Sequence, residues 1–297
     1  MNIDEFSPIE HYLADTANYE KRNEVSELQL TDSLKAIKAK AVEQGDQDIA
    51  KKAWCYETVH EIQKKYLTAF STMKDGRFYD AWCLLERVEI AINSLEKHFV
   101  SPEGDIFKIN FIDKHVSQFQ MLYPYKMFIS PAFLQLEKEC SICGSKISIR
   151  SFCGHRNGEI YNGEMCVHVI KKGHLLEISV VTNPVQKYSV LFLNDPETGK
   201  EVDHYNYQLV NYVIGGLGHP FDEWEAQKTK IRHPHALFAH INKNEKCPCE
   251  SGKLYKDCCL KEPSGVLRPH MSILFHSSPN TDLPQIVYPN YKELDKR

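Results

Sequence analysis

The chain has 297 residues, of which 42% are hydrophobic and 26% are charged, values that are ordinary for a globular protein with about two domains. Its formal net charge of −4 gives no general attraction to nucleic acid, so such a contact would need a local basic patch. No apolar run reaches the roughly 18 residues that a transmembrane helix requires, which excludes a membrane span from the prediction.

The first residues and the cysteines predict a compartment. Residues 1–6 are acidic and lack an apolar stretch, so a secretory signal is not expected. Ten cysteines in a chain without an export signal predict reduced, metal-bound or buried thiols, as in the cytoplasm.

The first part of the chain has helical periodicity. Apolar residues recur at three- and four-residue steps in three segments, Ser26–Gln44, Asp48–Met73 and Phe78–Phe99. The short connection at 74–76 predicts that the second and third segments form an αα-hairpin. We expect a helical domain over residues 1–136, whose last part is broken into short pieces by Pro124 and Pro131.

A first group of possible metal ligands begins at residue 140. Cys140 and Cys143 have the C-x-x-C spacing of a zinc knuckle, and the glycine that follows allows the backbone to turn. Cys153 and His155 complete one set of four ligands, and a competing set replaces His155 by Cys166. The spacing does not choose between these sets, and buried thiols beside a surface histidine are a third interpretation.

Residues 137–240 are predicted to form a Cys/His zinc-binding α+β domain. Two segments, Leu175–Thr182 and Tyr188–Leu193, have the composition of strands and predict a small sheet beside the metal site. An apolar segment from Tyr205 to Ile214 follows and ends at the glycine-rich residues 215–218. These glycines lack the spacing of a nucleotide-binding loop, and no P-loop motif occurs, so no nucleotide site is predicted.

A histidine-rich connector follows Trp224. His233, His235 and His240 are candidates for a third metal site or for a general base, and Pro234 predicts a loop followed by a short helix. No H-E-x-x-H motif and no obvious nucleophile accompany them, which argues against catalysis. These histidines, or the middle Cys/His cluster, are the sites of an alternative function, a metal-dependent hydrolase or nuclease.

The densest group of thiols lies in Lys246–Cys259. Its ligands, Cys247, Cys249, Cys258 and Cys259, occupy a segment too short to build an apolar core, and four thiolates suit tetrahedral Zn²⁺. Metal binding of about 10–16 kcal/mol would then supply the folding free energy. A redox dithiol would need a C-x-x-C on a βαβ pattern, and adjacent cysteines form a disulfide poorly, so residues 241–262 are predicted as a zinc knuckle.

The residues Cys-Pro-Cys-Glu-Ser-Gly-Lys-Leu-Tyr-Lys-Asp-Cys-Cys from Cys247 to Cys259 resemble the SEC-C motif, the zinc knuckle at the C-terminus of the SecA preprotein translocase and of many other bacterial proteins. The four cysteines fall on the ligand positions of that family. Glu250 stands where the family has glycine, and Leu260 stands where a glycine commonly follows. The resemblance covers about twenty residues and implies zinc binding and contacts to a translocation chaperone, the ribosome or another protein.

Positive charge collects around this knuckle. Lys246, Lys253 and Lys256, with Tyr255 for stacking on a base, form a predicted binding surface for RNA, the ribosome or an acidic protein. A solvated basic face is the alternative. Residues 263–297 contain several prolines and are predicted as an extended tail, in which Met271–Phe275 is apolar enough to form a strand.

These features predict an α+β protein, with an N-terminal helical bundle of αα-hairpins, a small zinc-stabilised domain that contains strands, and a C-terminal zinc knuckle. Two Zn²⁺ ions per chain are expected. The favoured function is recognition of a partner, as an adaptor, and the sequence leaves open whether the protein is an enzyme.

Overall fold

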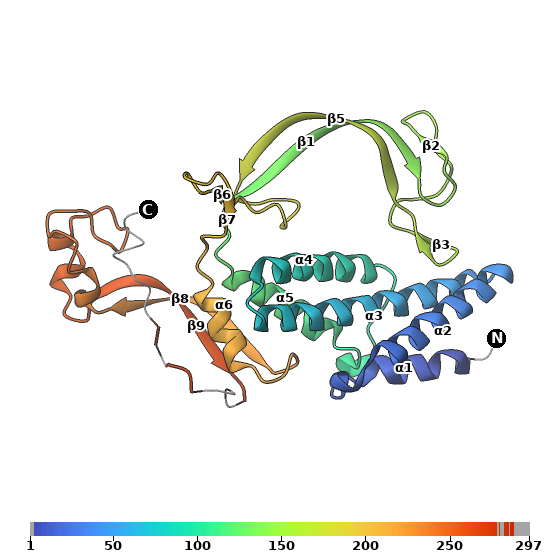
Figure 1. The fold of residues 1–297 in the computed structure, drawn as a ribbon, viewed down its shortest axis with the longest axis horizontal. Helices are drawn as coiled ribbons and strands as arrows, with labels where there is room; N and C mark the ends of the chain where they lie inside the picture. The colour runs from blue at the N-terminus through green and yellow to red at the C-terminus, as the bar shows by residue number, and fades with distance from the viewer. Residues whose placement is uncertain (1–2, 278, 280–281, 285, 288–297) are drawn as a thin grey trace. The chain divides into compact units, whose positions relative to one another are not determined.

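The computed structural model describes residues 3–277, 279, 282–284 and 286–287. Contacts within the chain divide it into two units, Met1–Ile214 and Gly215–Arg297 (Figure 1). The first unit joins the predicted helical domain to most of the predicted zinc-binding domain. The finer division into four domains remains a prediction.

The described residues of the first unit form five α-helices before its first strand: α1 (Ser7–Ala14), α2 (Glu24–Glu43), α3 (Gln47–Lys74), α4 (Phe78–Leu95) and α5 (Ile109–Leu122). The three long helices predicted from periodicity are confirmed as α2, α3 and α4. The starts of α2 and α3 are encoded locally, because the Asn23 side chain accepts from the Ser26 amide and the Asp46 side chain accepts from the Ile49 amide.

The helical core forms around α3, which packs against α2, α4 and α5. Val59, Ile62 and Tyr66 on α3 are fully buried, as is Leu85 on α4. Gln63 is also buried, and its amide donates to the carbonyls of Leu13 and Phe107 at 2.8 and 2.9 Å. These bonds satisfy a buried polar group and tie α1 and the segment before α5 to the centre of the bundle.

A long antiparallel ribbon follows the helices. Strand β1 (Phe128–Cys140) pairs with β5 (His168–Val181) along nearly its whole length, and β2 (Lys146–Ile147) pairs with the end of β1. The expectation that Pro131 breaks this region was wrong. Pro131 lies inside β1 opposite Ile178, and β2 pairs only with Lys138 and Glu139, so the ring needs no amide hydrogen on that edge.

Most of the ribbon is exposed to solvent. Phe133, Leu176 and Ile178 are 56%, 62% and 63% exposed, and Leu134 is 50% exposed. The middle of the ribbon therefore contributes little to the hydrophobic core. Figure 1 shows the β1–β5 ribbon as an arch beside the helices of the first unit.

The predicted strand at Tyr188–Leu193 was wrong. Only Val190 makes a bridge, to Phe128, and β6 (Leu193–Asn194) pairs with β7 (Glu201–Val202). The Ser189 carbonyl accepts from the Ile129 amide at 2.7 Å, and α4 holds the start of the segment: the Trp82 indole donates to the Lys187 carbonyl at 2.6 Å, and the Glu86 carboxylate accepts from the amides of Lys187 and Tyr188. The apolar segment predicted from Tyr205 to Ile214 forms helix α6 (Gln208–Gly216).

The second unit is built on one antiparallel pair of strands. Strand β8 (Trp224–His233) pairs with β9 (Val266–Phe275), and the predicted knuckle lies in the connection between them. The predicted connector is thus a strand up to His233, followed by the expected short helix at His235–Phe238. The predicted extended tail begins with a ten-residue strand, and its residues 288–297 lie outside the described part.

The prediction of an α+β protein is confirmed, with a helical N-terminal region followed by small sheets and a C-terminal cysteine cluster. Among the described residues, no helix has both the length and the apolar character needed to cross a membrane.

Candidate metal centres

The four thiols of the knuckle converge. The Sγ atoms of Cys247, Cys249, Cys258 and Cys259 all lie within 4.8 Å of one another. Cys249 and Cys258 are 3.5 Å apart and Cys258 and Cys259 are 4.0 Å apart, close to the roughly 3.8 Å edge of a tetrahedron with zinc–sulfur bonds of about 2.3 Å. The cluster could therefore hold a metal ion in the geometry that the spacing predicts.

Backbone hydrogen bonds bring the two cysteine pairs together. The Cys247 amide donates to the Lys253 carbonyl at 2.7 Å, and the Tyr255 amide donates to the Glu245 carbonyl at 2.9 Å. The chain thus reverses between the two pairs of thiols.

A small apolar cluster supports the thiols. It contains the buried side chains of Phe238, Tyr255 and Val266, packed with Cys247 and Cys259. The cluster is small, and it joins the thiols to the start of β9, so a metal would complete a core that the side chains alone fill only partly.

The thiols of the knuckle differ in their readiness to ionise. Burial raises the pKa of Cys247 to about 12. Burial also opposes ionisation of Cys249, but hydrogen bonds from the Ser251 hydroxyl and from the neighbouring thiols outweigh it and lower its pKa to about 6. A metal ion would shift this balance further, because it binds thiolates.

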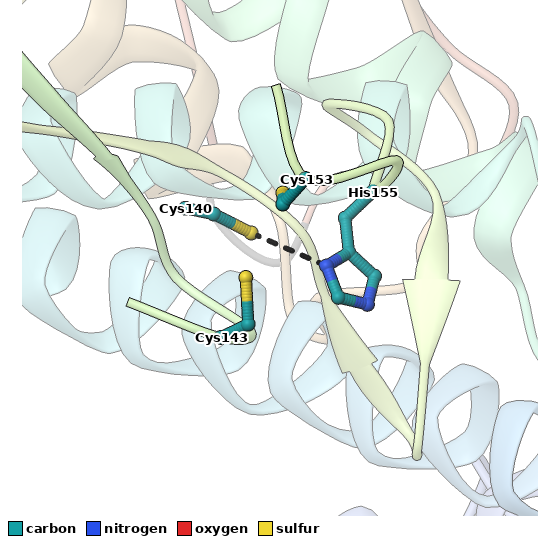
Figure 2. A group of neighbouring side chains, drawn as sticks. All are labelled: Cys140, Cys143, Cys153 and His155. Carbon is teal, nitrogen blue, oxygen red and sulfur yellow. Dashed lines mark hydrogen bonds between the residues drawn. The ribbon is translucent and has the colours of Figure 1, made fainter. Parts of the chain in front are cut away.

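The middle cluster also converges. The donor atoms of Cys140, Cys143, Cys153 and His155 lie within 4.8 Å of one another, and Figure 2 shows their side chains directed toward a common space. The Sγ of Cys140 is 3.7 Å from Nδ1 of His155. This second cluster could hold a metal ion as well.

Two chain reversals build the middle cluster. Between β1 and β2, the Cys140 amide donates to the Ser145 carbonyl and the Gly144 amide donates to the Cys140 carbonyl, both at 2.9 Å. The segment from Cys153 to His155 supplies the other two donors and precedes a short hairpin of β3 (Ile160–Tyr161) and β4 (Glu164–Met165).

Cys166 is a fifth donor beside this set. It is fully buried, and its Sγ lies 3.8 Å from that of Cys140. Burial and the neighbouring Cys140 raise its pKa to about 11. Burial also disfavours the Cys140 thiolate, but hydrogen bonds from the amides of Cys143 and Ile142 outweigh it and lower the Cys140 pKa to about 7.

The three connector histidines do not form such a cluster among the described residues. Nε2 of His235 donates to the Glu262 carbonyl at 2.8 Å, and its Nδ1 lies 2.7 Å from the Tyr255 hydroxyl. His233 is buried at the end of β8, with its ring 5.7 Å from that of His270, whereas His240 is exposed. His235 thus links parts of the knuckle, a role that its sequence context did not signal.

The predicted binding surface is partly corrected. Lys246, Lys253 and Lys256 are exposed, as expected for binding residues. Tyr255, however, is only 4% exposed, and its ring is packed beneath the knuckle. It offers no free face for stacking on a base, because its apolar ring fills the small core beneath the thiols.

Comparison with known families adds one decisive observation. A family model described as SEC-C motif matches residues 244–261, which include all four thiols of the knuckle. The chain carries a SEC-C motif. The match begins at residue 244, well after the middle cluster, so the motif accounts for one of the two groups of donors.

A relative shares a longer region. The chain is 28% identical over 93 residues to the protein translocase subunit SecA of Helicobacter pylori (strain ATCC 700392 / 26695). The shared region is 28% of this chain and 10% of that relative, so the match spans about a tenth of the relative's length. No solved structure matches the chain.

Proposed function

We propose that this protein is a structural zinc protein that uses its SEC-C knuckle to recognise a partner. The observation that carries the proposal is the convergence of four thiols at the knuckle, together with a second convergent set at residues 140–155. Zinc in structural sites is held by four protein ligands, whereas catalytic zinc keeps a position for water. Four donors in each cluster favour two structural ions.

The exposed residues of the knuckle favour a protein partner. Lys246, Lys253 and Lys256 supply positive charge, and Leu254 and Leu260 are 38% and 43% exposed beside them. Apolar contact within a charged rim is typical of protein interfaces. A ribosomal or chaperone surface with acidic groups fits this chemistry, and recognition of RNA would depend on phosphate contacts, since Tyr255 is buried.

The partner is sought with a matched pair of charge reversals. One variant replaces Lys246, Lys253 and Lys256 by Glu, and the control replaces Lys21, Lys35 and Lys97, which are exposed in the first unit. Both change the net charge equally. In affinity capture from a cytoplasmic extract followed by mass spectrometry, partners retained by the wild type and by the control should be lost from the knuckle variant.

Equal capture by both variants would contradict a partner site on the knuckle. A repeat of the capture after nuclease treatment separates protein from RNA: a protein partner survives the treatment. The alternative function, a hydrolase or nuclease, predicts a turnover activity that falls when zinc is removed and returns when zinc is restored.

A further inference from the structure

The β1–β5 ribbon needs support from outside itself. An isolated pair of strands is at best marginally stable in water. The middle of this ribbon is exposed, with Phe133 and Leu176 more than half accessible to solvent. Its stability must therefore come from its two ends.

One end of the ribbon is held by helix α4. Phe128 at the start of β1 is buried, and the residues that follow β5 are tied to α4 through Trp82 and Glu86. The Tyr79 hydroxyl adds a bond to the Tyr188 carbonyl at 2.8 Å. These contacts combine apolar packing with satisfied polar groups.

Hydrogen bonds and ion pairs join the other end to the helices, and Gly163 packs closely against the Lys38 side chain. The Gln47 side chain donates to the Asn162 side chain at 2.6 Å and accepts from the Asn162 amide at 2.9 Å. Nζ of Lys38 lies 2.9 Å from the Glu164 carboxylate and 2.7 Å from the Glu57 carboxylate. His98 lies 2.6 Å from the Gly158 carbonyl. The contacts of Asn162 and Glu164 are exposed and that of His98 is only partly buried, and polar contacts of this kind contribute little unless their residues are already held in place.

The residues that make these contacts directly follow His155, the last donor of the middle cluster, and precede its buried neighbour Cys166. Gly158, Asn162 and Glu164 all fall between His155 and Cys166, and Cys140 is the last residue of β1. A single ion bound by donors from the end of β1 and from the loop after β2 would fix this hairpin relative to the ribbon.

We propose that a zinc ion held by Cys140, Cys143, Cys153 and His155 fastens the far end of the β1–β5 ribbon to helices α2 and α3. This inference deepens the proposed function, on which it rests for the nature of the ion. Three thiolates and one imidazole around a tetrahedral centre suit zinc among the common divalent ions. Cys166 is assigned as a buried neighbour of Cys140 and not as a ligand, because it does not belong to the mutually close group of four.

The ligand assignment is tested by measuring the number of zinc ions per chain in the full-length protein by inductively coupled plasma mass spectrometry. We expect two ions in the wild type, one in Cys258→Ser, one in Cys140→Ser and two in Cys166→Ser. His155→Ala should bind the second ion at least about tenfold more weakly. Cys83→Ser, which lies outside both clusters, should keep two ions and serves as the matched cysteine control.

Cobalt substitution in the Cys258→Ser background reports the ligand set directly through the visible absorption of tetrahedral Co²⁺. Cys166→Ser should leave the spectrum unchanged, whereas His155→Ala should abolish or shift it. If instead Cys166→Ser loses the ion and His155→Ala keeps it, the assignment is overturned in favour of four thiolates.

The fastening role is tested by hydrogen exchange of the full-length protein before and after a chelator removes zinc. We expect faster exchange in residues 153–166 and 128–140, with α3 and α4 still protected. Unchanged exchange in the ribbon and the hairpin would overturn the fastening role. A wild type with one ion that disappears in Cys258→Ser would overturn the middle site and leave the knuckle of the proposed function intact.

Discussion

The carboxylate of Glu250 lies 2.7 Å from the guanidinium of Arg268, which joins the first turn of the knuckle to strand β9. Arg268 also donates to the Pro248 carbonyl. Glu250 has φ +63, in the left-handed region where glycine is accommodated without strain, and it occupies the position where SEC-C sequences have glycine. The ion pair therefore offsets part of the backbone strain that the substitution for glycine introduces.

This pairing predicts a difference between two variants. Glu250→Gly loses an exposed ion pair worth at most about 1 kcal/mol and relieves about 1 kcal/mol of strain, so its stability should remain close to that of the wild type. Glu250→Ala loses the pair and keeps the strain. We expect it to be about 1 kcal/mol less stable than Glu250→Gly in the denaturant unfolding of the second unit, and equal stability of the two variants would contradict the compensation.

At the C-terminal side of the knuckle, we predict a larger destabilisation when Gly265 is substituted. Its φ is +109, and a Cβ built there would lie 2.2 Å from the backbone carbonyl oxygen of His233. Gly265→Ala must displace the first pair of β8 and β9, at a cost of about 2–3 kcal/mol. Gly252→Ala is the control, because Gly252 has φ +77 with nothing within 4 Å and should cost only about 1 kcal/mol. Thermal unfolding of both variants gives the comparison.

The hydrogen bonds of Glu86 allow the contribution of α4 to the stability of the ribbon to be tested. Glu86 is 3% exposed and accepts from the amides of Lys187 and Tyr188. Glu86→Ala leaves two half-buried donors without an acceptor, so we expect a loss of about 2 kcal/mol or more in unfolding free energy. Glu86→Gln keeps one acceptor oxygen and should lose less. Hydrogen exchange at residues 187–190 should rise in the same order, and a larger loss for Gln than for Ala would contradict this role.

Because the His60 imidazole is buried, we predict that the protein loses stability in weak acid. His60 is 9% exposed, its Nε2 has no hydrogen-bond partner among the described residues, and burial lowers its pKa from the ordinary value of 6.5. The unfolded chain therefore binds a proton more readily than the folded one. The unfolding free energy keeps its full value above about pH 6.5 and falls as the pH decreases below it.

His60→Phe should make the pH dependence of the unfolding free energy shallower between pH 5.5 and 7, by at most about 1.4 kcal/mol per pH unit. Urea unfolding at several pH values measures it. His11→Phe, at an exposed position of α1, is the control and should leave the slope unchanged. The same slope in His60→Phe and the wild type would refute the buried neutral imidazole.

The sequence predicted those parts of the fold that depend on neighbouring residues. The helices α2, α3 and α4 follow from apolar residues at helical spacing, and the knuckle follows from four thiols in a short segment. The pairing of β8 with β9 was not predicted, because the whole knuckle separates the partners along the chain. The burial of Tyr255 was missed for the same reason, since its neighbours Phe238 and Val266 come from either side of the thiols.

The middle cluster shows where spacing alone is insufficient. Five donors between Cys140 and Cys166 satisfy the rules for zinc, and sequence distance does not say which four meet. The donor atom of His155 lies within the mutually close group of four, whereas Cys166 lies outside this group, next to Cys140.

The knuckle is also the turn of a hairpin. His233, the last residue of β8, pairs with Val266, the first residue of β9, so residues 234–265 form one large loop between paired strands. The entropy lost when the ends of a flexible loop meet grows with its length. An ion held by the four thiols would shorten the freely moving part of this loop and lower that entropic penalty, so it would stabilise the pairing of two strands that supply none of its ligands.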